Sequence, residues 1–146
     1  MHPFRIYSVP HTGTRFVQSF FNYQGFAPDL CHAGQSITDN LLLVIPQRHP
    51  YECYQSHCQK SGFDFARFIG WWHELIFRAE NSESFLFPIE EKSEATERKA
   101  CEFVDIPYAK GFPWVRVGAS DREREAKDYL SVARHLQFAV DWYGNQ

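Results

Sequence analysis

A continuous apolar run over residues 41–45 constrains the fold of this chain more than any other segment. The run reads Leu-Leu-Leu-Val-Ile, follows Asp39 and Asn40, and ends at Pro46. Apolar residues without polar alternation over this length are typical of a strand that is covered on both faces in a parallel sheet. We therefore expect a buried strand here, with a layer of helices on each side.

The segments around this strand alternate between strand and helix patterns. A β-prone run ends at Pro10, and the apolar residues of the segment 15–22 then fall on one helical face before Gly25. The later predicted elements are helices over 51–59, 64–79, 93–104 and 121–143, a strand over 85–87 and a loop over 107–119. Strands that alternate with helices imply right-handed βαβ units. The sequence thus predicts a three-layer α/β/α fold with a short parallel sheet.

Length and charge narrow the class of protein. The 146 residues are enough for one hydrophobic core, so residues 1–146 are expected to form a single domain. The formal charge of -3 disfavours a broad basic face for nucleic acid, so any anion site must be local. No apolar run approaches the length of a membrane span, and residues 1–9 lack the apolar region of a signal peptide. We expect a cytoplasmic protein whose four cysteines are reduced.

The turn after the first predicted strand carries residues that suit an anion. Residues 10–16 read Pro-His-Thr-Gly-Thr-Arg-Phe, in which Gly13 allows the backbone to approach a ligand between the hydroxyls of Thr12 and Thr14. The following helix begins with free N–H groups, which favour negative charge. The turn is therefore predicted to bind a phosphate. It lacks the Gly-Lys-Ser/Thr ending that grips Mg²⁺ and terminal phosphates, which argues against an ATP-dependent nucleotide kinase-like enzyme.

A second polar turn follows the buried strand. Arg48 lies at the predicted end of this strand, and Ser56 lies eight residues later on the adjoining helix. A guanidinium fork and a hydroxyl placed in this way can converge on a second phosphate.

Both turns resemble motifs of the sulfotransferases that use 3'-phosphoadenosine 5'-phosphosulfate (PAPS). The first loop of that family reads Pro-Lys/Arg-Ser/Thr-Gly-Thr-Thr-Trp/Phe, to which residues 10–16 are similar. Its second motif is an apolar strand that ends in Arg-Asn/Asp-Pro, with a Ser eight residues after the Arg. Residues 41–56 match this motif, with His49 in the Asn/Asp place.

The order of later motifs extends the resemblance over most of the chain. The matching segments are Trp71-Trp72 in a helix, residues 85–87 followed by Glu90, a helix that closes on residues 102–104, and the Lys110-Gly111 loop with Trp114. The resemblance implies a P-loop-like sulfotransferase fold. It also implies transfer of a sulfuryl group from PAPS to a hydroxyl-bearing acceptor, without a metal.

The resemblance assigns roles to individual residues of the two turns. It implies that the 5'-phosphosulfate is held by the first turn, whose matching residues are His11, Thr12, Gly13, Thr14 and Arg15. Phe16 would lie beside adenine, and Arg48 and Ser56 would hold the 3'-phosphate, with Lys110 as a third contact. The chain is shorter than typical members, so its acceptor site is either open, suiting a large or carbohydrate acceptor, or completed by a second subunit.

Catalysis requires a base and a positive charge. The acceptor-activating histidine of the family precedes its second motif strand, and His32 occupies that stretch. Relatives carry Lys or Arg where this chain has His11, whose unperturbed pKa of about 6.5 leaves it partly charged at pH 7. Three alternatives follow: Arg15 supplies the missing charge, the enzyme is weak, or the chain has kept nucleotide binding and lost turnover. A nucleotide-binding module is therefore the alternative to an enzyme.

Two further features of the sequence have structural alternatives. Cys53 and His57 share one face of a helix with Cys58 close by, a pattern that suits zinc, but no second pair of ligands is evident. Trp71 and Trp72 cannot both face the core from one helix. We expect one of them to pack in the core and the other to line the acceptor pocket.

Overall fold

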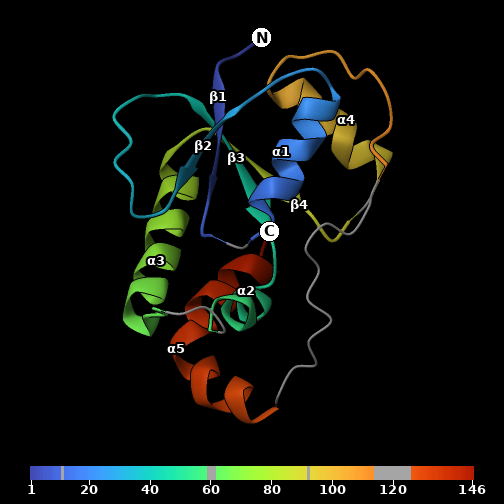
Figure 1. Cartoon of the computed structure of the whole chain (residues 1–146). Coiled ribbons are helices and arrows are strands. Elements are labelled where there is room, and N and C mark those ends of the chain that lie inside the picture. Colours follow the sequence, from blue (N-terminus) through green and yellow to red (C-terminus); the bar gives the residue numbers. More distant parts are fainter. Residues whose placement is uncertain (11, 59–61, 92, 114–125) are drawn as a thin grey trace.

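A four-stranded, all-parallel sheet forms the centre of the molecule (Figure 1). The computed structural model describes residues 1–10, 12–58, 62–91, 93–113 and 126–146, with side chains from residue 132 onward in the last range. The strands lie in the order β2-β1-β3-β4, and their bounds are β1 Phe4–Ser8, β2 Asp29–His32, β3 Leu42–Gln47 and β4 Ser84–Pro88. Because β2 and β3 flank β1, the chain reverses its direction of winding beside β1.

Helices cover both faces of this sheet and one of its edges. The described helices are α1 Thr14–Tyr23, α2 Pro50–His57, α3 Phe65–Asn81, α4 Glu94–Phe103 and α5 Ala126–Gly144. Helices α1 and α4 contribute to the core on one face, and α3 and α5 contribute to the core on the other. The fold is thus α/β with a parallel sheet between helical layers, as the sequence predicts.

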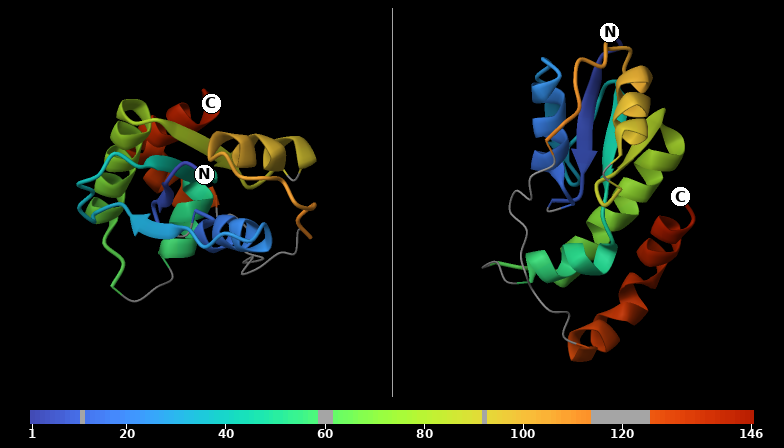
Figure 2. Two further views of the ribbon diagram at one scale, coloured as in Figure 1. Left: turned by 90° about the horizontal axis from the view of Figure 1, so that it is seen from above. Right: turned by 90° about the vertical axis from the view of Figure 1, so that its right-hand side faces the viewer.

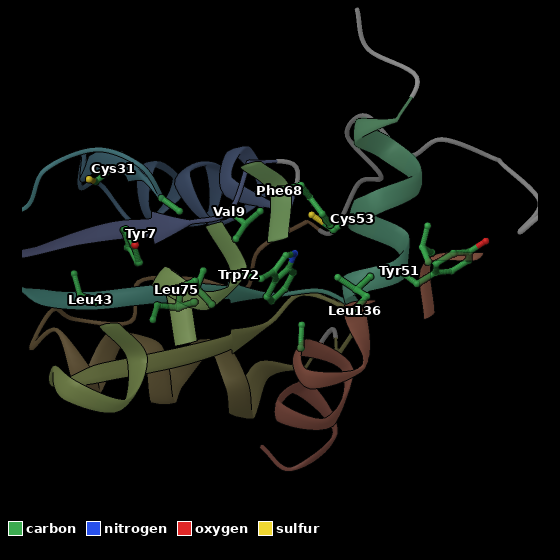
Figure 3. Close-up of a cluster of buried hydrophobic side chains, with 14 residues drawn as sticks. Tyr7, Val9, Cys31, Leu43, Tyr51, Cys53, Phe68, Trp72, Leu75 and Leu136 are labelled. Carbon is green, nitrogen blue, oxygen red and sulfur yellow. The ribbon is translucent and has the colours of Figure 1, made fainter. Parts of the chain in front are cut away.

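Successive side chains of β3 point to opposite faces of the sheet, and both faces are buried, which explains the continuous apolar run. Leu43 and Ile45 are buried with Trp72 and Leu75 of α3 in one core, which also contains Tyr7 (Figure 3). Val44 lies in the other core, between α1 and α4. Each face of β3 therefore meets a helical layer, and neither needs a polar residue.

Helices α2 and α5 lie across the edge at which the strands end, which we call the carboxyl edge (Figure 2). Pro50 opens α2 at its first turn, and the ring of His49 caps the helix because Nδ1 accepts a hydrogen bond of 3.2 Å from Tyr51 N–H. Leu136 of α5 is buried against the cluster that contains Tyr51 and Phe68. The carboxyl edge is therefore shaped by helices as well as by turns.

Strand β2 is the element that the sequence patterns did not predict. It has four residues, and Asp29 and Leu30 are exposed, so it shows neither a buried apolar run nor a long alternation. Its place follows from pairing with β1, in which Ser8 lies opposite His32. The predicted helix over 121–143 is confirmed from residue 126 onward, while its start and Trp114 lie outside the described residues. No helix of the described ranges is both long and apolar enough to cross a membrane.

Candidate functional site

The turn between β1 and α1 is held in place by buried hydrogen bonds. The hydroxyl of Thr12, which is fully buried, donates to the carbonyl of Val9 over 2.6 Å. The Pro10 carbonyl accepts from His57 Nε2 at 2.7 Å and from the Cys53 thiol at 3.3 Å, both on α2. These hydrogen bonds hold the turn to the residue that follows β1 and to α2.

Gly13 stands at the tip of this turn and begins α1. Its φ of +100° lies in the left-handed region, and a Cβ there would come within 2.6 Å of Ile89 Cδ1 beyond the end of β4. Gly13 has no side chain with which to cap α1, and none of the described residues is seen to cap it, so its first backbone N–H groups can bind an anion. This helix N-terminus points into the carboxyl edge, where ligands of open parallel sheets bind beside the strand at which winding reverses.

The predicted base, His32, lies beside the turn. His32 Nδ1 is 3.2 Å from the Ser8 hydroxyl, which is in turn 2.6 Å from the hydroxyl of Thr14. Ser8 is fully buried and Thr14 is 7% exposed, whereas the imidazole of His32 is half-buried. His32 Nε2 makes no hydrogen bond with the described residues, so this nitrogen is available to an incoming group.

The loop after β2 is held by α3. Gln35 Oε1 accepts from the backbone N–H of His32 at 2.8 Å, and Glu74 Oε2 accepts from Gly34 N–H at 2.9 Å. A Cβ at Gly34 would lie 2.9 Å from Nε1 of Trp71, so the indole packs directly on this turn. Trp72 is buried in the core, as predicted for one of the two, and Trp71 is half-buried at the edge of the same core. A role of Trp71 in an acceptor pocket stays a prediction.

Arg48 follows β3 at the same edge. Its Nε lies 3.8 Å from Glu52 Oε2, and the two side chains are 24% and 32% exposed. Ser56 is half-buried one further turn along α2, so it shares a helical face with Glu52. His49, in the place of the family's Asn or Asp, performs the capping that those residues favour.

The end of α5 reaches this second turn. Tyr143 Oη donates to Glu90 Oε2 at 2.9 Å, and its ring meets the His49 ring edge-on at 5.4 Å. Burial and the neighbouring carboxylates of Glu90 and Glu52 raise the pKa of Tyr143, so its hydroxyl stays protonated. One carboxylate, that of Glu52, therefore lies beside Arg48, whereas Thr14 is hydrogen-bonded to the uncharged hydroxyl of Ser8.

The remaining predicted contacts are spread along α1. Arg15 is exposed on the first turn of α1, and Phe16 is half-buried with its ring 5.8 Å from that of Phe112. The Lys110 ammonium lies 4.2 Å from the centre of the Tyr23 ring, at the far end of the helix. The structure thus brings Thr12, Gly13, Thr14 and His32 together and does not bring Lys110 to them. His11 lies outside the described residues.

Three parts of this arrangement were missed in the sequence. Ser8 is a buried polar residue at the end of β1, directly before the turn, and this position was a usable signal. Gln35 accepts from the backbone of His32, only three residues earlier, and no sequence motif marks this contact. Glu74 has no local signal either, because folding alone brings the backbone of Gly34 close to it. Cys53 and His57 do share one helical face, but they use it to bind a carbonyl.

Neither a metal centre nor a known relative defines this site. Within the ranges that the structure describes, no three His, Cys, Asp or Glu side chains gather in a way that could hold a metal ion. Comparison with known proteins finds no family model, curated protein or solved structure that matches the chain.

Proposed function

We propose that this chain is a sulfotransferase of P-loop-like fold that transfers a sulfuryl group from PAPS to an acceptor hydroxyl. The observation that carries the proposal is the line of hydrogen bonds from His32 through Ser8 to Thr14. In support, the His32 imidazole lies beside the Gly13 turn and the start of α1, and its Nε2 makes no hydrogen bond within the described part of the chain. A base next to an anion-binding turn is the arrangement that transfer of an anionic group to a hydroxyl requires.

The first turn binds the phosphosulfate in this proposal. The N–H groups at the start of α1 and the hydroxyl of Thr14 donate to its oxygens, and Gly13 permits the close approach of the backbone. Arg15, on the first turn of α1, supplies positive charge to the leaving phosphate oxygen. Arg48 and Ser56 bind the 3'-phosphate at the end of β3.

His32 removes the proton of the acceptor. The Nδ1–H of its base-competent tautomer donates to Ser8, and the Ser8 hydroxyl donates to Thr14, which leaves the lone pair of Nε2 free. As the acceptor oxygen bonds to sulfur, the bond between sulfur and the phosphate oxygen breaks. The proton moves to Nε2, and 3',5'-adenosine bisphosphate (PAP) leaves with the bonding electrons.

Calorimetric titration with PAP, with and without Mg²⁺, tests the nucleotide site. We expect saturable binding that does not depend on Mg²⁺ and that falls at least about tenfold in Arg48→Ala, because a charge-assisted contact is lost. Arg67→Ala, which removes an exposed arginine at the start of α3, is the matched control and should bind as the wild type does. Absence of PAP binding to the wild type contradicts the proposal.

A nucleotide-binding module without turnover is the second candidate. The observation in its favour is Glu52, which lies beside Arg48 and reduces the positive charge available to a phosphate. The two candidates differ in the response to His11→Lys, which introduces the cation that the resembled sulfotransferase loop carries at this position. A large gain in sulfuryl transfer to a phenolic or carbohydrate acceptor indicates that the native turn binds nucleotide without effective catalysis, whereas a loss indicates a role of His11 in the reaction.

A further inference from the structure

Two adjoining cavities open at the amino edge of the sheet, where β3 and β4 begin. Their volumes are about 360 and 340 Å³, and Asn40, Leu41 and Glu83 line both of them. This edge, near the N-terminus in Figure 1, is opposite to the carboxyl edge and its turns. The cavities are therefore separate from the proposed nucleotide site, and each has the volume of a small-molecule site.

Aliphatic side chains line one part of the larger cavity. Ile37 and Leu41 are half-buried, and Leu43 is buried at the start of β3. These side chains provide a surface for an apolar body of a few carbon atoms.

Arg78 lines the same cavity from α3. It is half-buried, yet it makes no ion pair or hydrogen bond with any residue of the described ranges. Glu74, one turn earlier on α3, accepts from the backbone of Gly34, and Asp39 binds Arg5. A half-buried guanidinium whose neighbouring carboxylates are engaged elsewhere favours an anion from solution.

Acidic residues also line the cavity. Exposed Glu83 is one, Asp39, which pairs with Arg5, is another, and α3 ends at Asn81 in the cavity wall. The C-terminal end of a helix attracts cations, as does a carboxylate. The cavity thus combines an anion-binding group, a cation-binding region and an aliphatic surface.

We propose that this cavity binds a free α-amino acid with an aliphatic side chain. The guanidinium of Arg78 holds its carboxylate, Glu83 and the end of α3 receive its ammonium group, and Ile37, Leu41 and Leu43 contact its side chain. A zwitterion satisfies both charged regions at once, whereas a simple anion would face Glu83 without compensation. This inference does not depend on the proposed sulfotransferase activity.

Titration of the intact protein with L-leucine, followed by two-dimensional amide NMR, tests the inference. Leucine should give saturable shifts at residues 41–43 and 81–83. Isocaproate, which lacks the ammonium group, and isoamylamine, which lacks the carboxylate, should each bind at least about tenfold more weakly, since each loses one charge-assisted contact. No saturable shifts with leucine, or equal affinity for isocaproate, would overturn the proposal, and so would shifts confined to residues 12–14.

Variants then locate the two charges. Arg78→Gln should weaken leucine binding at least about tenfold, and Arg78→Lys should restore part of it. Arg67→Gln and Glu80→Gln, exposed on the same helix, are matched controls that should leave the affinity unchanged. Unchanged leucine binding in Arg78→Gln would overturn the assignment. The comparison of leucine with isocaproate and isoamylamine uses the wild type alone, so the conclusion does not depend on the folding of any variant.

Discussion

The turn after β1 and the turn after β3 lie at the same edge of the sheet but are built from different interactions. The first uses backbone groups and buried hydroxyls, as in the pairs Thr12–Val9 and Ser8–Thr14. The second uses charged side chains that are partly exposed, above all Arg48 and Glu52. Packing fixes the shape of the first turn, whereas charge sets the properties of the second. Substitutions should therefore change stability mainly at the first turn and ligand affinity mainly at the second.

Gly13→Ala should have the largest effect. The left-handed φ costs a residue with a Cβ about 1–2 kcal/mol, and the Cβ would also collide with Ile89, 2.6 Å away. We expect a loss of unfolding free energy above about 2 kcal/mol in urea denaturation. Gly25→Ala is the matched control, because Gly25 has a φ of +95° with no atom in the way. Equal losses in the two variants would show that the contact with Ile89 is unimportant.

Ser8→Ala should come next. The substitution leaves the Thr14 hydroxyl and Nδ1 of His32 without their buried partner. We expect a loss of about 1–3 kcal/mol in unfolding free energy. If sulfuryl transfer is observed, its kcat should fall as well, because the tautomer of His32 is no longer held. Ser36→Ala, at an exposed position, should change neither quantity.

Tyr143→Phe tests the link between α5 and the second turn. The variant loses the hydrogen bond to Glu90, which is worth at most about 1 kcal/mol at this partly exposed position. Because the folded-state pKa is raised above the ordinary value of 10, the wild type should lose this part of its stability as the pH rises above 10. The unfolding free energy, measured by urea denaturation at several pH values between 8 and 11 around that ordinary value, should therefore decrease less with pH for the variant than for the wild type. The same decrease with pH in both proteins would show that Tyr143 does not contribute to the loss of stability at alkaline pH.

Glu52→Gln should have the smallest effect, and in the opposite direction. Removal of the carboxylate beside Arg48 should tighten PAP binding by about two- to fivefold at low salt, the range of an exposed ion pair. The gain should shrink as the salt concentration rises. Glu94→Gln, which breaks a similar pair with Arg98 on α4, should leave PAP binding unchanged. An equal gain at low and high salt would mean that charge is not the cause.

The sequence predicted the parts of this molecule that rest on local pattern. The apolar run at 41–45 predicted a strand buried on both faces, and Val44 and Ile45 are indeed buried against opposite helical layers. Gly13 was predicted to mark a turn, and its left-handed φ confirms the need for glycine. In both cases the neighbours along the chain determine the conformation.

The parts that depend on distant contacts were not predicted. Strand β2 forms because an edge is available on β1. Its first two residues, Asp29 and Leu30, are exposed, so the strand has no apolar periodicity by which it could be predicted. The position of α5 beneath the carboxyl edge depends on packing against α2 and α3, which no local pattern encodes. The pairing of Glu74 with Gly34 joins residues far apart in sequence for the same reason.

The contact between α2 and the first turn makes the reactivity of one thiol a measure of how often these two elements separate. Cys53 is fully buried with its thiol on the Pro10 carbonyl, and burial raises its pKa, so the closed structure protects it from electrophiles. A disulfide reagent can reach this sulfur only while α2 and the turn are apart. The rate at which the Cys53 thiol reacts therefore reports how often α2 and the turn separate, and a molecule that binds across the turn should slow this reaction.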